Sequence, residues 1–354
     1  MTHRFGIIGY GGMAGYHHAN SLKYEEFKDE FKYVAAYDIN PERLELAEKN
    51  GLIAYKTAEE LLADESIDTV LIATYNNFHH DYAIAAMRAG KNVICEKPVA
   101  MNAAELEEMI AVSKETGKVF TVHQNRRWDK DFNIVKKAYE SGVLGDAYTF
   151  ESRVHGANGA IFGWRRYKEM GGGMLLDWGV HMLDQLLFMF GDEKVVEVYA
   201  QFANVTVEEV DDYCKVILKF ESGKSATVEV GTTCYQPLPR WFVSGSKGTL
   251  VVKNWECEGS ILCSKNTETV WEPIVIQTVA GPTRTMAPRP KETMEEIPLP
   301  EADPHWTDYY HNVVAAIEGR EELIVKPEQA LRVLKVIDAA FACAEGTGSI
   351  KVNI

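Results

Sequence analysis

Three groups of residues in this 354-residue chain have the types and spacing that chemistry requires. The first is a glycine-rich turn at residues 9–14, which follows a strand-like apolar run and matches the pattern G-x-G-x-x-G/A. In that pattern Gly9 permits a tight turn, Gly11 lets the backbone approach a pyrophosphate, and Ala14 lets the next helix pack closely on the strand. Taken alone, the pattern also occurs in an ordinary strand-to-helix turn.

The surroundings of this turn indicate a dinucleotide site. Gly12 and Met13 open the next helix, whose free N–H groups and positive dipole end would face the phosphates. A second strand-like run ends in Asp38, whose carboxylate can accept hydrogen bonds from both ribose hydroxyls of an adenosine. The same carboxylate would repel a 2′-phosphate, which favours NAD. Because Arg43 is close in the sequence, NADP stays possible.

The second group is Glu96-Lys97-Pro98, at the end of the strand-like run 92–96. Ligands of open α/β sheets bind at the carboxyl ends of the strands. A lysine there could donate a hydrogen bond to a substrate oxygen or relay a proton, and the alternative is an exposed lysine at a strand end. Pro98 restricts the turn, and the sequence leaves open whether its peptide bond is cis.

The third group is Asp177 and His181, within the apolar, helix-like run from Gly171 to Phe190. Residues four apart share a helix face, as do His181 and Asp184 at a spacing of three. A carboxylate near an imidazole in apolar surroundings can set its tautomer and bring its pKa toward neutrality, as a general acid or base requires. The alternative is a core histidine that is satisfied by a helix cap or by Asp184.

The elements that must position these groups change in character near residue 125. Before it, short apolar strands alternate with helices, which predicts a parallel sheet covered on both faces, an α/β doubly wound Rossmann domain. The predicted strands are 4–9, 33–38, 69–74, 92–96 and 119–122, and the predicted helices are 41–50, 79–89 and 102–116.

The rest of the chain predicts an α+β domain with a large, mainly antiparallel open sheet. Strand-like runs between residues 195 and 252 are separated by turns, without intervening helices. Residues 281–304 contain six of the twelve prolines and predict an extended connection. Two helices, 303–319 and 327–345, are expected to close the chain.

Length and composition predict two domains in a soluble globular protein. We expect an NAD-binding domain at 1–125 and a substrate-binding and oligomerisation domain at 126–354, whose last helices can pack back on the first domain. The 37 Lys and Arg against 52 Asp and Glu give a net charge of −15, spread evenly along the chain. Binding to nucleic acid depends on phosphate neutralisation by basic residues, so no nucleic-acid partner is expected.

Other signals concern location and isolated polar residues. The chain shows no apolar run as long as a membrane span and no signal peptide, so we expect a cytoplasmic protein without a membrane partner. The six cysteines lack metal-ligand spacing, and we expect no metal site. Of the adjacent His17 and His18, one is expected in the core and one at the surface. The acids at 208–212 are expected in a solvated loop.

Together, the motifs GIIGYGGMA, AYDIN, ATYNNFH, CEKP and GGGMLLDWGVHMLD resemble the glucose–fructose oxidoreductase and inositol dehydrogenase family (Gfo/Idh/MocA), over essentially the whole chain. The resemblance implies that Lys97 hydrogen-bonds the reacting hydroxyl. It implies that His181 takes the hydroxyl proton as hydride leaves for the nicotinamide, and that Asp177 holds the substrate and the imidazole.

The resemblance also implies further cofactor contacts. Asn76 lies in a stretch similar to the family's T-P-N-x-x-H, with Tyr75 in place of proline, and His79 caps or packs beneath it. Trp164-Arg165 is similar to a W-R pair near the nicotinamide and phosphates. The expected cofactor residues beyond the glycine turn and Asp38 are Thr74, Asn76, His79, Glu96, Trp164 and Arg165.

The implied activity is NAD-dependent hydride transfer between a secondary alcohol of a cyclic polyol or sugar and nicotinamide. Residues 125–128 resemble a subset of the family that includes scyllo-inositol dehydrogenases. The same motifs would serve oxidation of a glycoside C3 hydroxyl or NADPH-dependent reduction of a sugar ketone. A non-enzymatic alternative is an NAD(H)-binding redox sensor. The open sheet predicts a homodimer or homotetramer, because its face would otherwise be an exposed apolar surface.

Overall fold

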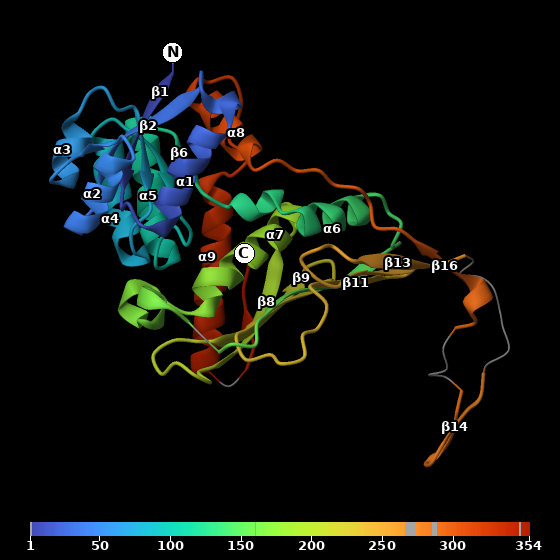
Figure 1. Ribbon diagram of the computed structural model, residues 1–354. Helices are drawn as coiled ribbons and strands as arrows, with labels where there is room; N and C mark the ends of the chain where they lie inside the picture. Colours follow the sequence, from blue (N-terminus) through green and yellow to red (C-terminus); the bar gives the residue numbers. More distant parts are fainter. Residues whose placement is uncertain (1, 160, 266–273, 285–288, 347) are drawn as a thin grey trace.

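The computed structural model describes residues 2–159, 161–265, 274–284, 289–346 and 348–354. Two large sheets organise this part of the chain, one built from its beginning and one from its middle and end (Figure 1). None of the described helices is long and apolar enough to cross a membrane.

The first sheet has six parallel strands in the order β3-β2-β1-β4-β5-β6, which confirms the predicted Rossmann domain. Its central strands are buried on both faces, which is why they appear in the sequence as continuous apolar runs. The strands are β1 (His3–Ile8), β2 (Phe31–Tyr37), β3 (Ile53–Ala54), β4 (Thr69–Ile72), β5 (Asn92–Cys95) and β6 (Phe120–Val122). The helices are α1 (Gly12–Lys23), α2 (Pro41–Lys49), α3 (Ala58–Ala63), α4 (His79–Arg88) and α5 (Ala103–Thr116).

The second sheet has nine strands in the order β16-β13-β12-β11-β7-β10-β9-β8-β17. Every neighbouring pair is antiparallel except β7 and β10, so the predicted, mainly antiparallel sheet is confirmed. The strands are β7 (Ala147–His155), β8 (Val195–Ala203), β9 (Tyr213–Phe220), β10 (Ser225–Gly231), β11 (Trp241–Gly245), β12 (Gly248–Val252), β13 (Gly259–Ser264), β16 (Met294–Ile297) and β17 (Ile350–Lys351).

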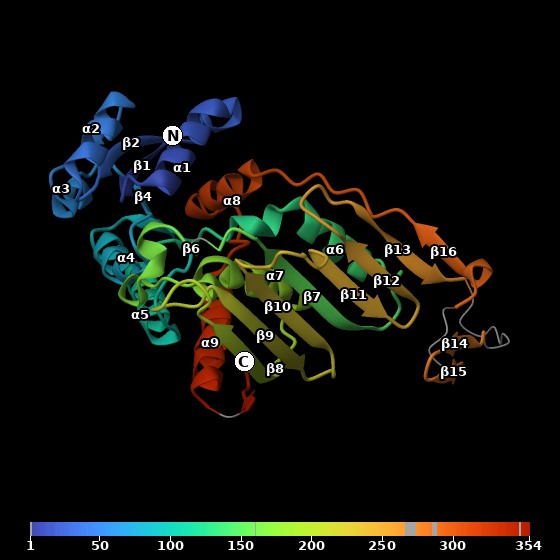
Figure 2. The same cartoon turned by 60° about the horizontal axis from the view of Figure 1, so that its bottom comes forward.

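Helices α6 (Lys130–Glu140), α7 (Val180–Phe190) and α9 (Pro327–Glu345) lie on one face of this sheet. Figure 2 shows the strands from the opposite side, where no labelled helix covers them. Helix α9 also contacts α5 and β6, and α8 (Thr307–Ile317) brings Tyr310 into a stack with Phe31 of β2. The last helices therefore contact both sheets, and the boundary at residue 125 stays a proposal.

The helix predicted from Gly171 to Phe190 begins only at Met174 and opens with a π-helical turn, Leu175–Gly179. Gly171 and Gly173 have φ values of 76° and 101°, which no right-handed helix accepts. Asp211 caps this start, because its carboxylate accepts a hydrogen bond from the Leu175 N–H at 2.8 Å.

The expectation of a solvated acidic loop at 208–212 is wrong for its last two acids. Asp211 and Asp212 are both buried. Asp211 caps the π-helical turn, and burial raises its pKa to about 7. The Asp212 carboxylate accepts hydrogen bonds from the backbone N–H groups of Val205 and Thr206. Both side chains close local turns by accepting N–H groups that would otherwise have no partner.

The proline-rich segment 281–304 is only partly an extended connection. It contains β16, which pairs with β13, and β15 (Gly281–Thr283), which forms a hairpin with β14 (Ile276–Thr278) that stands off the large sheet (Figure 2). Residues 285–288 lie outside the described residues. The helix predicted at 303–319 begins at Thr307.

Candidate active site

The glycine turn joins β1 to α1 and leaves space above the helix start. A Cβ atom on Gly9, whose φ is 90°, would lie 2.7 Å from the carbonyl oxygen of Ala73, so only glycine suits this position. Nothing lies within 4 Å of the Cβ positions of Gly11 and Gly12. Gly11 is the N-cap of α1 without a side-chain cap, and Ala14 is buried against the sheet. This open cradle of N–H groups suits a pyrophosphate.

Asp38 stands at the end of β2, beside β1. One carboxylate oxygen accepts the Asn40 N–H at 2.8 Å, and the other has no hydrogen bond among the described residues. The side chain is half-buried, and Arg43 is exposed. Together with the glycine cradle, this carboxylate fits the adenosine ribose of a dinucleotide. Met13 is partly exposed at the same helix start.

Lys97 and Asp177 come together from the two parts of the chain. The Lys97 ammonium lies 2.9 Å from Asp177 Oδ1 and 2.7 Å from the Asp177 carbonyl oxygen. Arg165 Nε lies 3.0 Å from the same carboxylate oxygen. Burial opposes the charge of Asp177, but the two cations outweigh it and lower the pKa of Asp177. The carboxylate is therefore ionised and shared by two cations.

His181 lies next to this pair but has a partner that the sequence did not reveal. Its Nδ1 lies 3.0 Å from Gln124 Oε1, beyond the end of β6. Because the amide oxygen only accepts, Nδ1 carries the proton and Nε2 has the lone pair. Burial, with Lys97 and Arg126, holds the pKa of His181 well below its usual value. The ring is therefore neutral, with its lone pair available on Nε2, and the expected shift of its pKa toward neutrality is wrong.

The predicted pairing of His181 with Asp177 or Asp184 is wrong in this structure. Asp177 faces two cations, which attract a carboxylate more strongly than a neutral imidazole does. Asp184 forms a buried, bidentate ion pair with Arg127, both bonds 2.7 Å long. A signal for Gln124 existed in the sequence, since it follows the last predicted strand of the Rossmann sheet.

The other predicted cofactor residues surround the junction of the two parts. Asn76 is buried and donates to the Gly171 carbonyl at 2.8 Å. His79 Nδ1 donates to the Pro98 carbonyl at 2.8 Å, after a cis Lys97–Pro98 peptide bond. Thr74 donates to the Tyr75 carbonyl at 3.1 Å. These side chains hold the loops on both sides of Lys97.

Trp164 and Arg165 belong to the second part of the chain. The Arg165 guanidinium lies 4.7 Å from the centre of the Trp164 ring, which also contacts Tyr75. Arg165 thus links the aromatic pair to Asp177. The structure places both residues at the junction, while their contact with a cofactor stays a prediction.

A cavity of about 360 Å³ opens beside Asp177 and Arg165. Phe162, Ile161 and Trp178 supply apolar wall, and His155 and Thr232 supply polar wall. His155 Nδ1 accepts the Leu238 N–H, and its pKa is lowered by burial, so the neutral ring carries its proton on Nε2. Neither His155 Nε2 nor Thr232 Oγ1 has a hydrogen-bond partner among the described residues. Sequence reasoning missed both.

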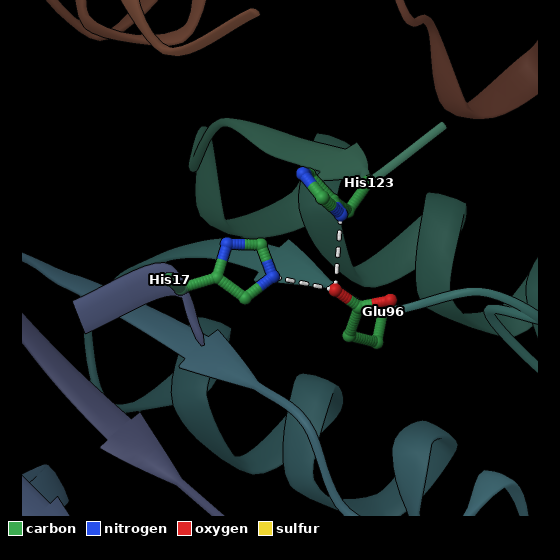
Figure 3. Close-up of side chains that lie close together, drawn as sticks. All are labelled: His17, Glu96 and His123. Carbon is green, nitrogen blue, oxygen red and sulfur yellow. Dashed lines mark hydrogen bonds and ion pairs between the residues drawn. The ribbon is translucent and has the colours of Figure 1, made fainter. Parts of the chain in front are cut away.

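The Glu96 carboxylate lies in a buried cluster with His17 and His123 (Figure 3). Their nearest ligand atoms lie within 4.8 Å of one another, a spacing that could hold an ion, so the absence of a metal site stays a prediction. The division of His17 and His18 between core and surface is wrong. Both are buried, because Tyr310 of α8 contacts His17 and the Tyr10 hydroxyl contacts His18.

Two family models match this chain. Residues 3–124 match "Oxidoreductase family, NAD-binding Rossmann fold", and residues 132–251 match "GFO/IDH/MocA C-terminal domain". The chain belongs to the Gfo/Idh/MocA oxidoreductase family. The resemblance noted in the sequence is confirmed. As a member it is an oxidoreductase with an NAD-binding Rossmann domain, in agreement with the open glycine cradle described above.

Several relatives are similar over much of their length. Myo-inositol 2-dehydrogenase of Thermotoga maritima is 32% identical over 259 residues, which are 71% of this chain and 75% of that protein. The scyllo-inositol 2-dehydrogenase (NADP(+)) of Bacillus subtilis is 27% identical over 99% of this chain and 96% of its own. Among solved structures, an NAD-binding protein from Listeria innocua has 41% identity and a TM-score of 0.94, with 99% of each chain covered.

Proposed function

We propose that this Gfo/Idh/MocA protein is a dehydrogenase that transfers hydride between NAD and a secondary alcohol of a cyclic polyol or sugar. One observation carries the proposal: Lys97, at the carboxyl edge of the Rossmann sheet, pairs with Asp177, which lines a cavity with apolar and polar walls, and neutral His181 follows Asp177 by four residues. A sugar or polyol ring offers matching C–H surface and hydroxyls. The inositol dehydrogenases among its relatives support this substrate class.

The side chains divide the proton chemistry between them. The Lys97 ammonium uses two of its three protons on Asp177, and the third can bind the reacting hydroxyl oxygen. His181, neutral and with its lone pair on Nε2, accepts the hydroxyl proton during oxidation and returns it during reduction. Asp177 orients Lys97 and forms part of the cavity wall. Bound nicotinamide supplies the hydride acceptor or donor.

We propose that the polar wall of the cavity, formed by His155 and Thr232, recognises the substrate. The Nε2–H of His155 is a donor without a partner among the described residues, and Thr232 Oγ1 is a second group in that state. Leaving buried polar groups unpaired is costly, so a hydroxyl-bearing ring that reaches both is favoured. The indole of Trp178, which stacks with Arg126 at 4.2 Å, gives an apolar surface beside them.

NAD is proposed as the preferred cofactor because Asp38 would repel a 2′-phosphate. The relative from Bacillus subtilis is named as an NADP(+) enzyme, so NADP remains the alternative. We place the protein in the cytoplasm, since all six cysteines are free. It is further proposed to act as a homodimer or homotetramer through the open face of the second sheet.

A screen for cofactor reduction tests the proposal. The purified protein is incubated with NAD or NADP and with inositols, aldoses and glycosides, and absorbance at the reduced-nicotinamide band is followed. NMR of the product then identifies the oxidised carbon. We expect turnover with an inositol or aldose. Oxidation of glycosides alone, at C3, would establish the first alternative, and reduction of a sugar ketone by NADPH alone would establish the second.

The redox-sensor alternative makes a different prediction for the same screen. A sensor would bind NADH yet turn over no substrate. A complete proton-transfer set argues against it, because regulation by cofactor binding does not need Lys97, Asp177 and His181 together.

A further inference from the structure

Three buried side chains form a cluster that includes Glu96, the residue before Lys97 (Figure 3). Glu96 follows β5 and directly precedes Lys97, His17 lies on α1, and His123 follows β6. Glu96 Oε1 accepts a hydrogen bond from His17 Nε2 at 2.7 Å and lies 3.0 Å from His123 Nδ1. We call these three residues the His–Glu–His cluster.

The Glu96 carboxylate of this cluster is ionised. Burial opposes ionisation, but His123 and His17 outweigh it and hold the pKa of Glu96 well below its usual range. Burial, together with His123, lowers the pKa of His17, so this imidazole is neutral and donates through Nε2. Its Nδ1 then accepts from the Tyr310 hydroxyl, which lies 3.1 Å from the Tyr33 hydroxyl. Imidazole groups therefore hold the ionised carboxylate.

No permanent cation neutralises this charge. Within the described part of the chain, the ion-pair contacts of Glu96 are with His17 and His123 alone. The neighbouring Lys97 directs its ammonium to Asp177. A buried carboxylate without a cationic partner is costly in free energy. A cation that arrives with a ligand would recover part of that cost.

The order of the strands indicates where such a ligand charge lies. Asp38 at β2 suits the adenosine, and the glycine turn at β1 suits the pyrophosphate. A dinucleotide lies across the carboxyl ends of the strands, so its other half extends over β4 and β5, on the far side of β1. Glu96 stands at the end of β5. The nicotinamide ring is cationic when oxidised and neutral when reduced.

The charge of Glu96 acts on other side chains of the site. Burial is the main cause that lowers the pKa of His181, Lys97 and His123 add to it, and Glu96 acts in the opposite direction. Burial likewise lowers the pKa of His79, and Glu96 again opposes the shift. The field of the carboxylate therefore extends to residues around Lys97.

We propose that ionised Glu96 sets the redox preference of the bound cofactor by stabilising the oxidised, cationic nicotinamide relative to the reduced, neutral ring. The inference rests on the proposed dehydrogenase function. His17 and His123 contribute by keeping the Glu96 carboxylate ionised. A lysine or arginine partner would also keep it ionised, but its permanent positive charge would cancel the field of the carboxylate. Glu96 is thus a positioning and electrostatic residue, distinct from the proton-transfer groups.

The test compares the affinities of the two cofactor forms. Glu96→Gln keeps the shape and removes the charge. We expect the ratio of the NAD⁺ to the NADH dissociation constant to rise about tenfold, a rough Coulomb estimate at an effective protein dielectric. Calorimetry measures the dissociation constant of NAD⁺, and fluorescence measures that of NADH. Glu96→Asp keeps the charge and should retain the wild-type ratio. Glu60→Gln removes an exposed carboxylate of the same domain and is the matched control.

Each outcome bears on the inference. A merely structural role would weaken both forms alike, so an unchanged ratio in folded Glu96→Gln overturns the proposal. If that variant does not fold, the double change Glu96→Met with His17→Phe, which fills the space with apolar groups, should show the same shift. One divalent metal per chain, bound by the cluster in the purified protein, would cancel the charge and also overturn it. Wild-type protein that binds neither form would refute the proposed function instead.

Discussion

Lys97 is the residue whose removal tests the active site most directly. It holds Asp177 through two contacts and stands at the carboxyl edge of the Rossmann sheet. Lys97→Ala is expected to lower kcat by about 10²–10³, the usual cost of removing one hydrogen-bond donor to a reacting oxygen. Binding of NAD, measured by calorimetry, should persist, because the glycine cradle is untouched. Unchanged turnover would remove Lys97 from the mechanism.

Asp38 is proposed to select between the two cofactors through its charge. Asp38→Ala is expected to narrow the preference for NAD over NADP, since it removes both the ribose contact and the repulsion of a 2′-phosphate. The measurement is kcat/KM with each cofactor. Glu42→Ala, an exposed acid on the following helix, is the control. An unaltered affinity for NAD in Asp38→Ala would argue against the ribose contact.

The protonation of His181 is expected to determine how activity falls at acidic pH. We propose its neutral form as the base for alcohol oxidation, and burial with Lys97 and Arg126 lowers the pKa of His181 well below 6.5. We therefore expect kcat/KM for oxidation to be retained at pH 6.5 and to fall only at lower pH, as the ring takes a proton. The NMR titration of the His181 ring should follow the same pH dependence. In Lys97→Met the pKa should rise, because a neighbouring positive charge is lost.

At the scale of elements, Arg127 connects three segments. It forms a bidentate pair with Asp184 of α7 and donates to Gln329 of α9 and to the Ile324 carbonyl. Both members of the pair are 2% exposed. The pair holds the turn after β6, where Gln124 begins, against the helix that carries His181.

Breaking that pair should destabilise the fold. Asp184→Asn leaves the Arg127 charge buried with one partner fewer, and we expect a loss of about 3–5 kcal/mol in the free energy of unfolding. Urea unfolding followed by circular dichroism measures it. Glu140→Gln breaks the exposed pair with Lys136, and its expected cost is below about 1 kcal/mol. Equal effects of the two changes would contradict the assigned role.

At the scale of the whole molecule, the face of the second sheet opposite α6, α7 and α9 is expected to form a contact between copies. Tyr199 and Ile217 lie side by side on β8 and β9 and point to that face. Replacing both with lysine should convert a dimer or tetramer to monomers, measured by light scattering after gel filtration. Leu22→Lys, on the exposed side of α1, should leave the mass unchanged. A monomeric wild-type protein would refute the expectation.

Local patterns were sufficient for the architecture. Continuous apolar runs predicted strands of the Rossmann sheet, and strand-like runs separated by turns predicted β8, β9, β10 and β12 of the second sheet, whereas β11 was not predicted. The short β3 and α3 have too little pattern to predict. The start of the helix at Met174 was missed because its cap, Asp211, is 36 residues away.

The sequence by itself determined the Rossmann turn, the acidic residue after β2, and the two segments that carry Lys97 and His181, since each depends on neighbours within one element. Only the tertiary structure decided which side chains meet. Lys97 and Asp177 are 80 residues apart, His181 and Gln124 are 57 apart, and His17 and Glu96 are 79 apart. Contact between the two parts of the chain brings the first two pairs together, and the folding of the Rossmann domain brings His17 to Glu96. Burial then sets the charge of these groups. The spacing of residues within one element reveals neither which partners meet nor which charges they carry.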